Sequence, residues 1–160
     1  MIRLLWLSAL VVILDQASKL WVVARFAEYE VLTVWPVFNL TLVYNTGAAF
    51  SFLSDAGGWQ RWFFVVLGSA VCLGMVIWLR LLRDDERVTG WGLVLVIGGA
   101  LGNLIDRVRL GKVVDFLQWH WHDWYWPSFN VADSAITLGV ALLLDRKSTR
   151  LNSSHVSPSR

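Results

Sequence analysis

A run of 18 residues without a charged side chain, Trp62 to Leu79, constrains the fold more than any other feature of the sequence. A membrane-spanning helix needs ~20 apolar residues, with a range of ~17–25. Further apolar stretches occur at Leu4 to about Val23, at Gly90 to Ile105, and at Val131 to Leu144. The last stretch is short for a ~30 Å hydrocarbon core. We therefore predict a membrane all-α fold, a four-transmembrane-helix bundle with helices at about 4–23, 62–80, 88–106 and 131–145.

Composition agrees with a membrane protein. Hydrophobic residues make up 56% of the chain and charged residues only 16%, against ~25% charged residues in soluble domains. The net charge of +2 gives no reason to expect a nucleic-acid partner. The first apolar stretch is too long for a cleaved signal peptide and contains Asp15 and Lys19, so it is retained as a membrane helix.

The connections between these helices have their own patterns. Val31 to Tyr44 is rich in β-branched and aromatic residues and is interrupted by Pro36, which predicts two short strands around a turn. The connection at about 28–58 is therefore predicted to form a small β-rich lobe. Residues 146–160 are polar and lack periodicity, which predicts a disordered tail after a single domain at 1–145, with a non-native origin of this tail as an alternative.

Polar residues interrupt the apolar pattern on one side of the predicted bundle. Four alternating spans bring the end of the first helix, the end of the third and the start of the fourth to the same leaflet. The polar residues at these ends are Asp15, Gln16, Lys19, Asn103, Asp106, Arg107, Asn130 and Asp133, with Asp115 in the connecting loop. Ionisable groups within a bilayer are costly and usually face a partner or a wet cavity. Their convergence predicts a functional site.

Structural explanations remain open for several of these residues. Asp15 and Lys19 are four residues apart, so they can neutralise each other along one helix face. Asn130 and Asp133 have the residue types that cap a helix N-terminus. Gly99 and Gly102 lie on the same stripe as Asn103 and Asp106, where small residues permit close helix packing.

A metal site is the alternative for the aromatic loop. His120, His122 and Asp123 have side chains that bind zinc, but they alternate with tryptophans, and this pattern is more typical of an interfacial loop or strand. We predict no metal and no cofactor. Asp115 and Asp133 then remain as a carboxylate pair. If the two groups approach each other, one holds a proton while the other is charged, a state suited to activating water for peptide hydrolysis.

Orientation and protein class stay open at this level. With the N-terminus inside, the cytoplasmic loops hold four basic residues and the outer loops five once residues 146–160 are left out, so charge does not decide the orientation. A transporter with a proton or ion path through Asp15, Lys19, Asp106 and Arg107, or a non-catalytic membrane scaffold, are the alternative classes.

Five segments of the chain resemble the bacterial lipoprotein signal peptidases, also called signal peptidase II. They are DQASK (15–19), YNTGAAFS (44–51), GGALGNLIDR (98–107), VVDF (113–116) and FNVADSAI (129–136). They occur in the order and spacing of that family. The resemblance implies an intramembrane aspartic endopeptidase that cleaves prolipoproteins before a diacylglyceryl-modified cysteine.

The resemblance also implies roles for particular residues. The catalytic pair would be Asp115 and Asp133, and the supporting or substrate-binding residues would be Asp15, Lys19, Asn45, Gly99, Asn103, Arg107 and Asn130. It implies a bacterial inner-membrane enzyme with both termini cytoplasmic, an extracytoplasmic β-rich lobe at about 28–58 and the site near the outer face. The expected partners are lipidated prolipoproteins, membrane lipid and globomycin-type inhibitors, and family precedent favours a monomer.

Overall fold

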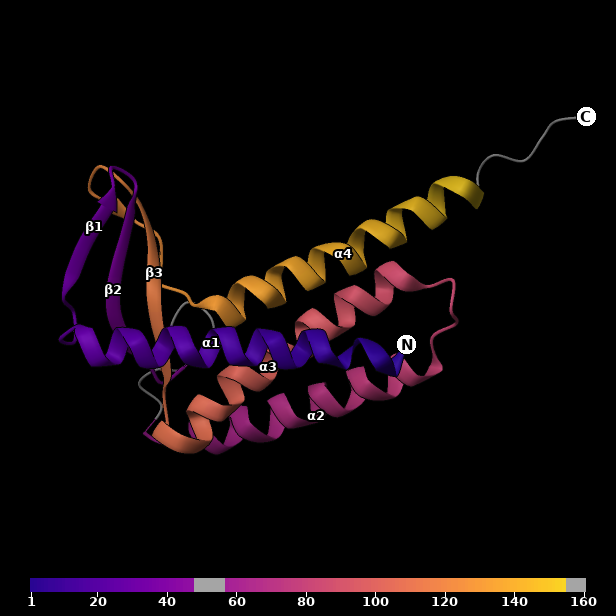
Figure 1. The fold of residues 1–160 in the computed structure, drawn as a ribbon, viewed down its shortest axis with the longest axis horizontal. Coiled ribbons are helices and arrows are strands. Elements are labelled where there is room, and N and C mark those ends of the chain that lie inside the picture. Colours follow the sequence, from indigo (N-terminus) through magenta and orange to yellow (C-terminus); the bar gives the residue numbers. More distant parts are fainter. Residues whose placement is uncertain (48–56, 155–160) are drawn as a thin grey trace, which may run out of the picture.

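The computed structural model describes residues 1–47 and 57–154 of the chain. A short 3₁₀ turn at Ile2–Leu4 leads into the first of four helices. The helices are α1 (Leu5–Arg25), α2 (Gln60–Leu81), α3 (Arg87–Leu110) and α4 (Val131–Ser154). The strands are β1 (Val31–Trp35), β2 (Phe38–Asn45), β3 (Val113–Trp121) and β4 (Trp124–Tyr125). The helices extend from one end of the molecule toward the sheet at the other (Figure 1).

Three helices of the described chain are long and apolar enough to cross a membrane: Ile2–Arg25, Gln60–Leu81 and Arg87–Leu110. Backbone polar groups cannot remain unpaired in lipid, and a helix satisfies them within its own segment. The predicted count of four membrane helices is therefore not confirmed, because α4 is absent from this set. Its residues beyond Asp145 are mostly polar.

The structure also changes the predicted C-terminal boundary. Helix α4 continues past residue 145 to Ser154, so the first part of the predicted disordered tail is helical. Extending an existing helix costs much less than nucleating a new one, and the lysine and arginine residues here are good helix formers. Residues 155–160 lie outside the described residues.

The strands form a four-stranded antiparallel arrangement in the order β1-β2-β3-β4. The two strands expected around Pro36 are confirmed as β1 and β2. The boundaries of the predicted lobe miss β3 and β4, which come from the segment between α3 and α4. Apolar and polar residues in this segment alternate around several tryptophans, a pattern that predicts an interfacial loop or strand but not its pairing with β2. Residues 48–56 of the predicted lobe lie outside the described residues.

Helix α3 is the central element of the bundle and packs against α1, α2 and α4. Its residues Leu93 and Val94 are fully buried, together with Leu79 of α2. Small residues bring α3 and α4 together, since a Cβ atom added at Gly92 would lie 2.9 Å from the carbonyl oxygen of Gly139. The close packing fixes the position of α4 relative to the end of α3.

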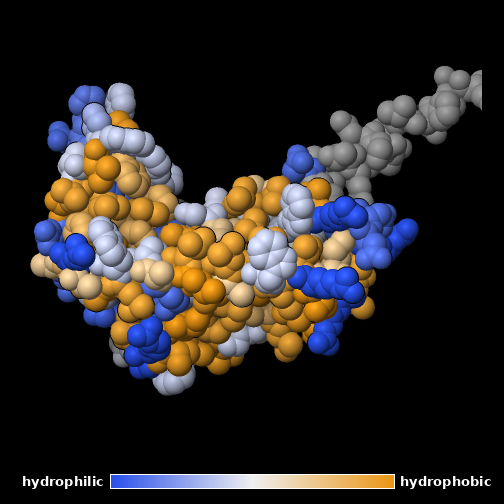
Figure 2. All heavy atoms as spheres, in the orientation of Figure 1, coloured by the Kyte–Doolittle hydropathy of each residue, from blue (hydrophilic) through white to orange (hydrophobic). Residues whose placement is uncertain are grey.

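The outer surface of the helices is strongly apolar. Most of α2 is exposed, and side chains such as Trp62, Val66 and Leu73 lie on the surface. Figure 2 shows hydrophobic residues over the helical part of this face and hydrophilic residues gathered toward its ends. An exposed apolar surface of this extent is suited to contact with lipid.

Candidate active site

A tight turn after α3 starts the strand that carries Asp115. Gly111 adopts a left-handed conformation with φ of 73°, and its backbone N–H donates to the carbonyl of Arg107. Glycine adopts this conformation without the steric penalty of a Cβ atom, so the helix can stop here. Strand β3 begins two residues later and pairs with β2, with Val43 opposite Asp115. Asp115 therefore lies close to the polar end of α3.

The chain then returns along β3 before entering α4. Backbone hydrogen bonds join Phe129 to Phe116 and Leu117. They place Asn130 and the first turn of α4 beside Asp115. Asn130 Oδ1 accepts the backbone N–H of Asp133 at 2.9 Å, and Asp133 Oδ2 accepts the backbone N–H of Asn130 at 3.3 Å. This reciprocal pair is a capping box, so the capping interpretation of these two residues is correct.

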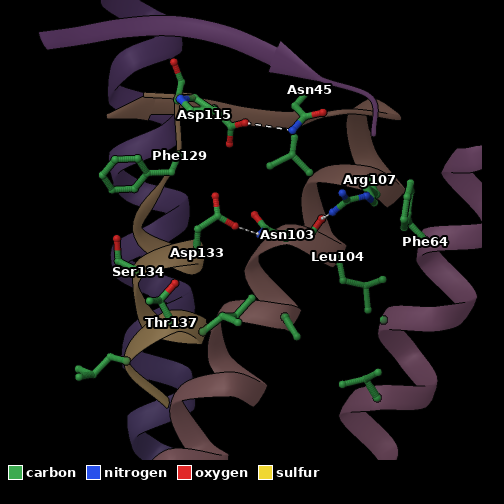
Figure 3. A pocket seen from close by; sticks show the side chains of 18 of the residues that line it. Asn45, Phe64, Asn103, Leu104, Arg107, Asp115, Phe129, Asp133, Ser134 and Thr137 are labelled. Carbon is green, nitrogen blue, oxygen red and sulfur yellow. Dashed lines mark hydrogen bonds between the residues drawn. The ribbon is translucent and has the colours of Figure 1, made fainter. Parts of the chain in front are cut away.

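The capping residues also belong to a polar cluster around the two carboxyl groups. Asn130 Nδ2 donates to Asp115 Oδ1 at 2.8 Å, and Asn45 Nδ2 donates to Asp115 Oδ2 at 3.3 Å. Asn103 Nδ2 donates to Asp133 Oδ1 at 2.8 Å. In Figure 3 the carboxyl groups of Asp115 and Asp133 lie above one another on the same side of the pocket. Capping and site formation are therefore compatible roles for the same residues.

A cavity of about 940 Å³ opens beside these groups. Its polar wall includes Asn45, Asn103, Arg107, Asp115 and Asp133. Its apolar wall is formed by side chains of α2, α3 and α4, including Phe64, Leu67, Val71, Leu104, Ile136 and Leu138. A cavity with a long apolar wall and a few converging polar groups is a typical ligand-binding site.

The environment of Asp115 favours its protonated form. Burial, and secondly the charge of Asp133, raise the pKa of Asp115 from its ordinary value of 3.8 to about 7. Hydrogen bonds from Asn45 and Asn130 and the charge of Lys19 oppose the shift without cancelling it. A carboxyl group with a pKa near neutrality can hold or release a proton under physiological conditions.

A buried ion-pair network lies beneath the two aspartates. Lys19 Nζ lies 2.8 Å from Asp15 Oδ2 and 2.9 Å from Asp106 Oδ2. It also donates to Asn103 Oδ1 at 3.0 Å. The predicted neutralisation of Asp15 by Lys19 is thus confirmed, but Lys19 also connects two further residues of α3. Gln16 Nε2 donates to Asp106 Oδ1 at 2.9 Å on the edge of this network.

Two further predicted residues, Arg107 and Gly99, make contacts that shape the cavity and the packing next to it. Arg107 donates to the carbonyl of Gly47 at 2.6 Å, and its guanidinium lies 5.0 Å from the centre of the Phe64 ring. Gly99 contacts the first turn of α4, where a Cβ atom would overlap the carbonyl oxygen of Ala132. The structure thus brings together the two aspartates and all seven of the predicted supporting residues.

Asp106 and Gln16 are among the polar residues expected at this leaflet, but the family resemblance assigns neither of them a role, although both belong to this cluster. Asp106 Oδ2 accepts the backbone N–H of Val114 at 3.0 Å, next to Asp115. Asp106 follows Asn103 by three residues, so their spacing predicts that both side chains lie on the same face of the helix. This spacing did not indicate that the carboxylate would reach the start of β3.

The histidine side chains lie outside the cavity lining, although the neighbouring Trp119 and Trp126 belong to it. His120 is stacked on Tyr125 with ring centroids 5.5 Å apart, and neither residue lines the cavity. Within residues 1–47 and 57–154, no group of three or more histidine, cysteine, aspartate or glutamate side chains is arranged to hold a metal ion. The geometry therefore gives no support to a zinc-binding role for His120, His122 and Asp123.

The fold and site define a multi-pass membrane protein with a carboxylate-containing cavity between its helices. The family model described as signal peptidase (SPase) II matches residues 7–146. The lipoprotein signal peptidase of Pseudoalteromonas atlantica is 51% identical over 143 residues, covering 89% of this chain and 87% of the relative. That of Aeromonas hydrophila is 52% identical over 144 residues, covering 89% and 86%. The chain belongs to the signal peptidase II family.

A solved structure described as a bacterial membrane enzyme has the same fold. It superimposes with a TM-score of 0.83 and 29% sequence identity, over 96% of this chain and 92% of that one. Family membership and the apolar helices together identify this chain as a multi-pass protein of the bacterial inner membrane.

Proposed function

We propose that this signal peptidase is an aspartic endopeptidase in which Asp115 and Asp133 form the catalytic pair. The reaction is removal of signal peptides from prolipoproteins, the activity of its family. The observation that carries the residue assignment is the shared cavity wall on which both carboxyl groups are held by asparagine side chains. Peptide hydrolysis by two carboxyl groups requires one to be charged and the other protonated.

The surroundings of the two groups support a division of roles. The raised pKa of Asp115 makes it the proton carrier. Asp133 accepts hydrogen bonds on both oxygens, one from Asn103 and one from the backbone of Asn130, at the N-terminus of α4. A helix N-terminus stabilises negative charge. Burial raises the pKa of Asp133 as well, and the hydrogen bonds from Asn103 and the Asn130 backbone oppose that rise without cancelling it. With Asp115 holding the shared proton, Asp133 is assigned as the ionised member that removes a proton from the attacking water.

The reaction then proceeds by general acid–base catalysis. Asp133 takes a proton from water as the water oxygen bonds to the scissile carbonyl carbon, and Asp115 donates a hydrogen bond to the carbonyl oxygen. Collapse of the tetrahedral intermediate breaks the C–N bond, and the leaving nitrogen takes up a proton from the pair. The shared proton allows the same two groups to act in both steps.

The apolar wall formed by α2, α3 and α4 supports a lipid-linked substrate. Side chains such as Phe64, Leu67 and Val71 continue the cavity along the helices toward the bilayer. Diacylglyceryl chains on the substrate cysteine can remain in lipid beside this wall, with ~0.8 kcal/mol gained per buried CH₂. The cleavage point before the lipidated cysteine, and inhibition by a globomycin-type cyclic peptide, are part of this proposal.

The proposed orientation places both termini in the cytoplasm and the site near the outer face. Met1 and the far end of α4 lie at the end of the molecule opposite the sheet (Figure 1). The sheet displays exposed aromatic side chains, among them Trp35, Trp121 and Trp124. Tryptophan is favoured at the membrane–water interface, which supports a sheet at the membrane surface. We propose that the enzyme acts as a monomer.

Two substitutions test the catalytic assignment. Asp115→Asn and Asp133→Asn keep the size of each side chain but remove the shared proton chemistry, so each variant should lose cleavage of a lipidated prolipoprotein. Asp123→Asn is the matched control, because Asp123 is an exposed carboxylate between β3 and β4 and does not line the cavity. Cleavage is followed by the mobility shift of the purified substrate in detergent or liposomes. Retained turnover by either active-site variant would contradict the assignment.

A further inference from the structure

We propose that Lys19 is a positioning residue that sets the separation of Asp115 and Asp133 by acting through Asp15 and Asp106. The inference rests on the proposed function, because it takes these two aspartates as the catalytic pair. It concerns the buried network on the side of α3 that faces α1.

Each candidate catalytic aspartate follows a residue whose backbone N–H is bound by a buried carboxylate. Asp15 Oδ1 accepts the N–H of Ala132 at 2.9 Å, one residue before Asp133. Asp106 Oδ2 accepts the N–H of Val114 at 3.0 Å, one residue before Asp115. The two hydrogen bonds are equivalent attachments of the chain just before each aspartate. One joins α1 to α4, and the other joins α3 to β3.

One ammonium group joins these two attachments. Lys19 Nζ contacts Asp15 at 2.8 Å and Asp106 at 2.9 Å. Its remaining contact is with Asn103 Oδ1 at 3.0 Å, and the Nδ2 atom of the same amide donates to Asp133. An ammonium has three donors, and all three are directed to groups that hold the pair. Lys19 also fixes the orientation of the Asn103 amide, because its oxygen is held by a cation.

Charge neutralisation alone does not account for this arrangement. One carboxylate would balance Lys19, whereas two buried carboxylates share it, with exposed fractions of 0% for Asp15 and 3% for Asp106. Burying a second carboxylate is costly unless it makes specific bonds. The Asp106 carboxylate forms an ion pair with Lys19 and accepts hydrogen bonds from Gln16 Nε2 and from the Val114 N–H. The second carboxylate therefore has a geometric role at the start of β3.

The packing around Asp15 leaves little freedom to compensate. A Cβ atom added at Gly102 would lie 2.5 Å from Asp15 Oδ2 and 3.3 Å from the Cβ atom of Ala132. The carboxylate thus fits against the bare backbone of α3 at Gly102, next to the first turn of α4. Loss of Lys19 would leave Asp15 and Asp106 to repel each other, and the residues before Asp133 and Asp115 would move apart.

The test measures kcat and KM for a lipidated prolipoprotein, normalised to the fraction of folded enzyme. Because misplacing reacting groups by ~1 Å costs ~10²-fold in rate, Lys19→Met should lower kcat about 100-fold. KM should change by less than about threefold, since substrate binding is not altered. Lys112→Met is the matched control, because Lys112 lies over the Tyr44 ring and outside this network. An unchanged kcat in Lys19→Met would overturn the proposal.

A second pair of variants decides the question if Lys19→Met fails to fold. Asp106→Asn retains an oxygen that can accept the Val114 N–H, whereas Asp106→Ala does not. We expect Asp106→Asn to recover most of the kcat that Asp106→Ala loses, and equal losses in the two would overturn the proposal. Parallel Asp115→Asn and Asp133→Asn variants separate the two hypotheses. If these remain active, the catalytic assignment fails; if they are inactive while Lys19→Met is fully active, only the positioning role fails.

Discussion

Replacing Gly99 by alanine tests how closely α3 and α4 must pack for the carboxylate pair to form. A Cβ atom at Gly99 would overlap the carbonyl oxygen of Ala132 and lie 2.7 Å from Ile136 Cγ1. Ordinary contacts begin near 3.4 Å. The first turn of α4 must therefore withdraw by about 0.7 Å or more, because a close-packed interface cannot absorb the added methyl group.

The expected magnitudes follow from this displacement. Overpacking of a well-packed interface costs ~1–3 kcal/mol of unfolding free energy. Asp133 lies on the turn that moves, one residue after Ala132, and a displacement approaching ~1 Å reduces the rate by up to ~10²-fold. The Gly99→Ala variant should thus lose both thermal stability and cleavage activity per folded molecule.

A thermal unfolding measurement in detergent and a prolipoprotein cleavage assay read out the two effects. Gly74→Ala in α2 is the matched control, because nothing lies within 4 Å of a Cβ atom at this position. Its helix should gain up to ~1 kcal/mol from the better propensity of alanine. A Gly99→Ala enzyme with wild-type stability and wild-type activity would refute the reasoning.

Four further results are expected. The cleavage rate should decline as the pH rises above about 7, because Asp115 then loses its proton, and a pH–rate profile measures this. Since the folded pKa of Asp115 exceeds its ordinary value of 3.8, stability should fall as pH rises from about 4 to 7, and Asp115→Asn should flatten this slope in thermal unfolding scans. Asn130→Ala should lose ~0.5–2 kcal/mol of stability as a lost cap and should also lose most cleavage, since the same side chain binds Asp115. Arg61→Ala should lower the melting temperature by the equivalent of ~1–3 kcal/mol with little change in kcat, because Arg61 binds the carbonyls of Arg107 and Val108 at the end of α3.

The membrane helices and the first two strands were predictable because their signals are local. A charge-free run such as Trp62–Leu79 has few alternatives to a membrane helix, and alternating β-branched residues around Pro36 have few alternatives to a hairpin. The lengths were less predictable. Helix α4 extends to Ser154 because an existing helix can continue through polar residues, and no local signal marks where it stops.

The position of β3 could not be predicted from its own residues. Asp115 becomes part of the site because β3 pairs with β2, with Val43 opposite Asp115, although the two strands are separated in sequence by α2 and α3. Pairing at such distances depends on the helices between the strands. The polar cluster was nevertheless expected, because alternating spans bring particular helix ends to the same leaflet.

The sequence by itself determined that the chain enters a membrane and that its few polar residues gather near one face. Hydrophobicity and span order suffice for both conclusions, since each is a property of the linear chain. Only the tertiary structure decided which polar atoms meet. Lys19 was predicted to pair with Asp15, but its bonds to Asp106 and Asn103 require α1 and α3 to lie in contact. Directional contacts between separate helices depend on their packing, and the sequence of neither helix specifies that packing alone.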